Sequence, residues 1–114
     1  MKLLIPGGAG YIGSHMVKLA QNQGHEVVVL DNFSTGHEWS LKDCEILRVD
    51  LLDAEKLSKS LKNRSFDGVI HFAAKSLVSE SIVKPNSYYE NNFVGTLNLV
   101  NEMIKNDLNS LVFS

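Results

Sequence analysis

The chain has 114 residues, a net charge of −2, 44% hydrophobic residues and 21% charged residues. These values are typical of one globular domain, and they exclude a strongly basic surface, so we expect no nucleic-acid partner. No apolar run approaches the roughly 18 residues of a membrane-spanning helix, and the first apolar run is too short for a signal peptide. The single cysteine, Cys44, cannot form an internal disulfide, which favours a reducing, cytoplasmic location without a membrane partner.

The first third of the chain predicts two buried strands on either side of a helix. The apolar run at residues 2–6 predicts the first strand. Residues 11–23 have helical spacing, and Gly24 suits the end of a helix. The side of this helix that we expect to face the sheet consists of Ile12, Met16, Leu19 and Ala20. The β-branched run at residues 26–30 predicts a second strand, of the kind found in parallel sheets covered on both faces.

The middle of the chain predicts two more strands around a second helix. A third strand, ending at Asp50, is indicated by Ile46, Leu47 and Val49. Asp53 can cap a helix that runs to about residue 63. The inward side of this helix is expected to be formed by Ala54, Leu57 and Leu61. Residues 68–72 predict the fourth strand.

The last part predicts a long helix and a fifth strand. The helix is expected to begin near Pro85, because proline suits the first helical turn. Its inward side is expected to consist of Tyr89, Phe93, Leu97, Val100 and Ile104. Gly95 within this helix is either a mild defect or a point of close backbone approach. The fifth strand is predicted at residues 111–113.

This alternation of strands and helices predicts an α/β fold, a Rossmann-type doubly wound parallel sheet with the strand order 3-2-1-4-5. In that order the ligand crevice lies between strands 1 and 4, at their carboxyl ends. Because the sequence stops at the fifth strand, we expect a sheet truncated there and one incomplete domain over residues 1–114. A strand left open at the edge could pair with a second copy and give a homodimer.

The glycine-rich turn after the first strand is the most informative stretch. Gly7, Gly10 and Gly13 have a spacing that allows a tight turn, a close approach to a pyrophosphate and close packing of the helix. Phosphates then bind free N–H groups at the helix N-terminus. Asp31 follows Gly13 by eighteen residues, where a carboxylate is expected to bind the hydroxyls of an adenosine ribose. The alternative is a glycine-rich turn that binds no ligand. That alternative explains the glycines but not the acidic residue at position 31.

Asp31 also predicts which dinucleotide binds. A carboxylate accepts hydrogen bonds from a ribose diol and repels a 2′-phosphate. The two arginines, Arg48 and Arg64, are not next to Asp31 in the sequence. We therefore favour NAD over NADP as the cofactor.

Because ligands bind at the carboxyl ends of the strands in this fold, further cofactor-binding residues are expected there. These are Asn32 after the second strand, Asp50 and Leu51 after the third, and Phe72, Ala73 and Ala74 after the fourth. Asp50 could equally cap a helix or stabilise its own loop. The four histidines and one cysteine lack the spacing of metal ligands, so no metal site is expected. His71 lies inside a strand and is interpreted as a buried, hydrogen-bonded histidine.

Several longer motifs resemble a known family, the extended short-chain dehydrogenases/reductases, and within it the nucleotide-sugar 4-epimerases. The motifs are residues 7–15, residues 24–32, Ser34-Thr35-Gly36-His37, residues 69–74, Lys84-Pro85, Tyr88-Tyr89, Asn91-Asn92 and Gly95-Thr96. The resemblance covers the whole chain and implies NAD as the cofactor. The sequence departs from the family pattern at Pro6, where a threonine is usual, and at Ser76, where some members have a lysine.

The resemblance implies a role for each matching residue. The backbone amides of Tyr11 and Ile12 would bind the pyrophosphate of NAD. The adenosine ribose would be held by Asp31, Asn32, Phe33, Ser34, Thr35 and Gly36. Asp50 and Leu51 would flank the adenine. The path to the nicotinamide would be lined by Phe72, Ala73 and Ala74, and the nicotinamide ribose would be approached by Asn91.

In complete members of this family, the tyrosine of a Tyr-x-x-x-Lys pair takes the proton of the sugar C4 hydroxyl while NAD accepts the hydride. Tyr11, Tyr88 and Tyr89 have no lysine four positions later, and the part that would bind a UDP-sugar is missing. We therefore assign no catalytic residue and expect this chain alone to be inactive. Three functions stay open: the NAD-binding portion of a nucleotide-sugar 4-epimerase or related dehydratase or reductase, a module that only binds NAD, and a fragment without function.

Overall fold

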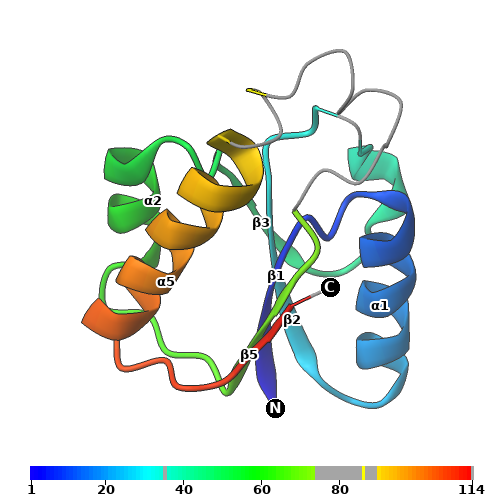
Figure 1. Cartoon of the computed structure of the whole chain (residues 1–114). Helices are drawn as coiled ribbons and strands as arrows, with labels where there is room; N and C mark the ends of the chain where they lie inside the picture. Colours follow the sequence, from blue (N-terminus) through cyan, green and yellow to red (C-terminus); the bar gives the residue numbers. More distant parts are fainter. Residues whose placement is uncertain (35, 74–85, 87–89, 114) are drawn as a thin grey trace.

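Five parallel strands form one sheet at the centre of the computed structural model, in the order β3-β2-β1-β4-β5 (Figure 1). The structure describes residues 1–34, 36–73, 86 and 90–113. The strands are β1 (Lys2–Pro6), β2 (Glu26–Asp31), β3 (Glu45–Arg48), β4 (Gly68–His71) and β5 (Leu111–Phe113). The predicted fold class and strand order are confirmed.

Helices cover both faces of this sheet. The α-helices are α1 (Tyr11–Asn22), α2 (Ala54–Leu61) and α5 (Gly95–Lys105), with a short 3-10 helix η1 (Glu38–Ser40) and a π-helical turn η2 (Glu90–Val94). Figure 1 shows α2 and α5 together on one side of the sheet and α1 on the other. None of the helices in the described ranges is both long enough and apolar enough to cross a bilayer.

The face beneath α2 and α5 holds the larger core. Every second residue of a strand points toward this core, and these residues include Leu4, Val28, Leu30 and Val69. They pack with Leu57, Leu61, Leu99 and Met103 of the two helices. Burying a leucine side chain of this kind stabilises the fold by about 1.5–3 kcal/mol. Leu57 and Leu61 face inward as predicted, whereas Ala54 is exposed because it lies in the first turn of α2.

Helix α1 is rotated away from the orientation that its apolar residues predict. Ile12 and Leu19 are 63% and 54% exposed, Met16 is half-buried, and only Ala20 of the predicted set is fully buried. The side facing the sheet is formed by Gly13, Val17 and Ala20. Gly13 causes this rotation, because a Cβ at that position would lie 2.1 Å from the carbonyl oxygen of Gly7. Since only a glycine can approach the turn so closely, residues four and seven positions later also face the sheet.

Helix α5 repeats the same arrangement. The predicted inward residues Phe93, Leu97 and Ile104 are exposed, and the prediction for Tyr89 lies outside the described residues. The buried side is formed by Gly95, Leu99, Glu102 and Met103. A Cβ at Gly95 would lie 3.2 Å from the Cβ of Leu51, so this glycine is a point of close approach and not a defect.

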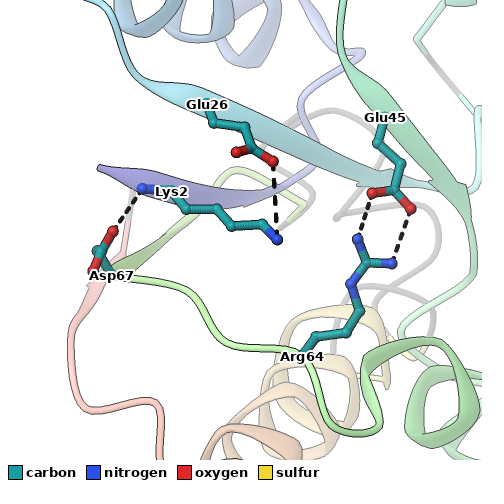
Figure 2. Close-up of polar contacts among 5 residues, drawn as sticks. All are labelled: Lys2, Glu26, Glu45, Arg64 and Asp67. Atoms are coloured by element: carbon teal, nitrogen blue, oxygen red, sulfur yellow. Dashed lines mark hydrogen bonds and ion pairs between the residues drawn. The ribbon is translucent and has the colours of Figure 1, made fainter.

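Charged side chains close the amino ends of the strands (Figure 2). The backbone N–H of Lys2 donates to Asp67 Oδ2 at 2.7 Å, and its Nζ lies 3.9 Å from Glu26 Oε2. Arg64 pairs with both carboxylate oxygens of Glu45, one of them at 2.9 Å. Hydrogen bonding to Arg64 lowers the pKa of Glu45. The loop before β4 is thereby tied to the first residue of β3.

Candidate functional site

The turn between β1 and α1 depends on Gly7 and Gly13, where a side chain has no space. Gly7 has φ +80°, and a Cβ there would lie 2.4 Å from the backbone carbon of Phe72. The Gly7 carbonyl accepts from Gly10 N–H at 3.1 Å and occupies the space that a Gly13 side chain would need. The turn therefore packs directly against the end of β4 and against the first turn of α1.

The first turn of α1 presents unpaired backbone donors. Within the described part of the chain, the N–H groups of Tyr11, Ile12 and Gly13 have no hydrogen-bond acceptor, and the first paired amide is that of Ser14, which donates to Gly10 at 2.8 Å. The N-cap is Gly10, which has no side chain to satisfy them. Three free donors at the positive end of a helix dipole form an anion-binding geometry.

The carboxylate of Asp31 lies against this same turn. Asp31 is only 9% exposed. Its Oδ2 accepts a hydrogen bond from Ala9 N–H at 3.0 Å, and its Oδ1 accepts one from Phe33 N–H at 2.7 Å. Each carboxylate oxygen can accept a further hydrogen bond. Asp31 thus joins the glycine turn to the loop after β2 and keeps acceptor capacity for a pair of hydroxyls.

The loop after β2 folds back over the glycine turn. A Cβ at Gly36 would lie 2.4 Å from the backbone of Ala9, and His37 N–H donates to the Ala9 carbonyl at 3.3 Å. Ser34 N–H donates to Asn32 Oδ1 at 3.0 Å. The structure therefore brings the predicted residues of this loop together beside Asp31, while Thr35 lies outside the described residues.

The loop after β3 joins the site through Asp50. Asn32 Nδ2 donates to Asp50 Oδ2 at 3.1 Å, and Leu52 N–H donates to Asp50 Oδ1 at 2.9 Å. Leu51 is 7% exposed and packs in the core near Gly95. Its carbonyl accepts from Asn98 Nδ2 at 2.7 Å. Asp50 shapes its own loop, and Leu51 can present only its backbone to a ligand.

The end of β4 lies against the glycine turn. Phe72 N–H donates to the carbonyl of Pro6 at 2.7 Å, so the proline does not interrupt this contact between the strands. The backbone of Phe72 and Ala73 lies against Gly7. Ala74 and the side chain of Asn91 lie outside the described part of the chain.

His71 is the buried histidine that the sequence predicts. It is 1% exposed, Nε2 lies 3.0 Å from Thr96 Oγ1, and Nδ1 accepts from Ala73 N–H at 3.1 Å. Because Nδ1 accepts, we assign the ring proton to Nε2. Burial lowers the pKa of His71 from 6.5 to about 4. The imidazole is neutral and links β4 to α5.

Arg48 lies beside Asp31, contrary to the argument from sequence distance. The two residues are Cα partners in the pairing of β2 with β3. The Arg48 guanidinium carbon lies 4.4 Å from the centre of the Phe33 ring, and Nη2 lies 2.5 Å from Glu38 Oε2. Sequence reasoning missed Arg48 and Glu38, together with the N–H of Ala9. Only the register of β2 against β3 could have placed Arg48 at the site.

The sequence model of the NAD dependent epimerase/dehydratase family matches residues 3–114. The chain belongs to this family. Among its relatives, the UDP-glucose 4-epimerase of Halalkalibacterium halodurans is 46% identical over 114 residues, which are the whole chain and 34% of that relative. The UDP-glucose 4-epimerase of Corynebacterium glutamicum is 44% identical over 115 residues and is covered to the same extent.

Solved structures of the family superpose closely on this chain. The UDP-glucose 4-epimerase of Thermus thermophilus, a complex with NAD, has a TM-score of 0.94 and 37% identity over 99% of this chain and 37% of that chain. The enzyme of Brucella ovis, also in complex with NAD, has a TM-score of 0.92 and 38% identity over 98% of this chain and 34% of that chain. The chain therefore spans about a third of the length of these relatives.

Proposed function

We propose that this chain binds NAD, with the pyrophosphate at the start of α1 and the adenosine ribose at Asp31. One observation carries the proposal: the N–H groups of Tyr11, Ile12 and Gly13 have no acceptor among the described residues, and Asp31 contacts the same turn through Ala9. Three donors suit a diphosphate, and a carboxylate suits a vicinal diol. The complexes of two relatives with NAD support this assignment.

Each remaining residue of the crevice has a proposed role in the same arrangement. The ribose would be enclosed by Asn32, Phe33, Ser34, Thr35 and Gly36. The backbone of Leu51 and the side chain of Asp50 would flank the adenine. The nicotinamide half would extend past Phe72, Ala73 and Ala74 toward Asn91. Two contacts support these roles: the backbone of Phe72 and Ala73 lies against Gly7, and Gly36 lies against Ala9, so both segments adjoin the turn that offers the free amides.

We further propose that, within a longer protein, this chain is the NAD-binding portion of an enzyme that interconverts UDP-glucose and UDP-galactose. Bound NAD would supply reversible hydride acceptance. The general base and the sugar site would come from another part of the protein, because no tyrosine of this sequence has a lysine four positions later. The names of the relatives support this proposal. The chain alone would bind NAD without epimerising the sugar.

A second copy of the chain is a proposed partner. Strand β5 lies at the edge of the sheet, and its three residues are exposed. An open edge of this kind can pair with another strand. Sedimentation velocity would show a dimer, and a monomer at all concentrations would contradict it.

Calorimetric titration of the purified chain with NAD and NADP tests the proposed function. NAD should bind weakly but more tightly than NADP, and UDP-galactose should not be converted when it is added with NAD. Absence of NAD binding, or tighter binding of NADP, would contradict the cofactor assignment. Measurable epimerisation would contradict the assignment of the base to another part of the protein.

A further inference from the structure

Arg48 and Glu38 form an ion pair beside the carboxylate that we assign to the ribose. Arg48 and Asp31 occupy the same register position on β3 and β2. Val27 and Val29 of β2 pack on the side of α1, so Asp31, two residues after Val29, projects on that side as well. Paired residues of neighbouring strands share a face, and the side chain of Arg48 therefore leaves the sheet next to that of Asp31.

The Arg48 guanidinium has two contacts that hold it near the ribose loop. Its carbon lies 4.4 Å from the centre of the Phe33 ring, and Nη2 lies 2.5 Å from Glu38 Oε2. Phe33 in turn donates its N–H to Asp31 Oδ1 at 2.7 Å. A cation on an aromatic face is attracted by the ring, so Phe33 connects the arginine to the carboxylate at the site.

The ion pair determines how this corner of the site would receive a phosphate. In Rossmann folds that bind NADP, an arginine near the ribose accommodates the 2′-phosphate. Arg48 is the register partner of Asp31, but its guanidinium is bonded to the carboxylate of Glu38, which offsets its charge. The side chains of Arg48 and Glu38 are 56% and 58% exposed, and a pair so exposed contributes little to stability. Its main consequence is the local charge near Asp31.

We propose that Glu38 is a specificity-determining residue, which keeps the site selective for NAD by withholding Arg48 from a 2′-phosphate. Asp31 repels the phosphate directly, and Glu38 removes the nearby cation that would offset this repulsion. The inference rests on the proposed function, because it concerns the same ribose site.

The test compares the ratio of the dissociation constants for NADP and NAD in four variants and the wild type. Glu38→Gln frees the charge of Arg48 while keeping the size of the side chain, and NADP binding should improve roughly five- to tenfold relative to NAD. In Glu38→Gln with Arg48→Gln this gain should disappear. Arg48→Gln alone should leave NADP no better bound than in the wild type. Glu26→Gln, at the opposite end of β2, changes the net charge equally and should leave the ratio unchanged.

The outcomes separate the two proposals. If the wild type binds NAD but Glu38→Gln leaves the ratio unchanged, the role of Glu38 is wrong and the cofactor assignment stands. A gain that persists in the double variant, or that also occurs in Glu26→Gln, likewise overturns it. If the wild type binds neither dinucleotide, the proposed function itself fails and the role of Glu38 fails with it.

Discussion

At the amino ends of the strands, charged groups are paired with one another, whereas at the carboxyl ends backbone donors point outward without acceptors in the described structure. Arg64 and Glu45 join two segments through a bidentate contact at one end. At the other end, the first turn of α1 offers three unpaired N–H groups beside Asp31. The polar groups at the amino ends are used within the fold, whereas those at the start of α1 remain available to a ligand.

The largest effect is expected where the carboxyl end depends on backbone contact. Gly13→Ala places a Cβ 2.1 Å from the Gly7 carbonyl oxygen, so it should lower the free energy of unfolding by about 3 kcal/mol and abolish NAD binding. Gly24→Ala is the matched control, because Gly24 has φ +87° but open space around it. It should cost only about 1 kcal/mol. Urea unfolding followed by circular dichroism measures both, and equal losses would contradict the role of the close contact.

His71 lies near the carboxyl ends of the strands, and both of its ring nitrogens have hydrogen-bond partners. Its pKa of about 4 in the folded chain is below its ordinary value of 6.5, so only the unfolded chain binds the proton between these values. Stability is therefore lost as the pH falls through this range, by about 2 kcal/mol between pH 7 and pH 5.

Urea midpoints at the two pH values measure this loss. His71→Gln keeps a hydrogen-bonding side chain without the titration, and it should lose less stability on acidification than the wild type. Equal pH dependence in the two proteins would show that His71 does not remain neutral in the folded chain.

Asp31→Asn should have a smaller effect on stability and a specific effect on binding. One acceptor oxygen is replaced by an amide, so Ala9 N–H or Phe33 N–H loses its partner, at a cost of about 1 kcal/mol. NAD affinity should fall roughly tenfold, because a charged acceptor for the ribose is lost. Calorimetry gives the affinity, and an unchanged value for NAD would contradict the role of this carboxylate.

The smallest effect is expected at the amino ends. Arg64→Gln breaks the pair with Glu45, and because both side chains are partly exposed, it should cost less than about 1 kcal/mol. The loss should shrink further in 1 M salt. Dinucleotide affinity should not change, and a reduced affinity would show that the two ends of the sheet are not independent.

The sequence predicted those parts of the fold that follow from local patterns. The strand order followed from the alternation of strands and helices. The positions of Gly7, Gly13 and Asp31 could be read from their spacing in the sequence. The choice between the two apolar sides of α1, and likewise of α5, could not be made from the hydrophobic pattern. It depends on Gly13 and Gly95, whose contacts with distant backbone are invisible in a hydrophobic pattern.

Arg48 shows a second limit of sequence reasoning. It is seventeen residues from Asp31 in the chain but is its partner across β2 and β3. Parallel register depends on how the intervening loop packs, and that loop is anchored through Gly36 and His37 on Ala9. The presence of a cation beside Asp31 could therefore be learned only from the structure.

The proposed NAD site depends most on the free amides at the start of α1, and Tyr11→Pro tests them most directly. Proline is tolerated at the first position of a helix, and Gly10, with φ −72° and ψ 175°, has the extended conformation that a following proline requires. The variant removes one N–H without removing a hydrogen bond within the described chain. Tyr11→Ala is the control, since it removes the side chain and keeps the N–H.

Calorimetric titration of both variants with NAD is the decisive measurement. We predict that Tyr11→Pro binds NAD roughly tenfold or more weakly than Tyr11→Ala, as expected for a lost hydrogen bond to a charged phosphate. Equal affinities for the two variants would contradict the proposal that the start of α1 binds the pyrophosphate.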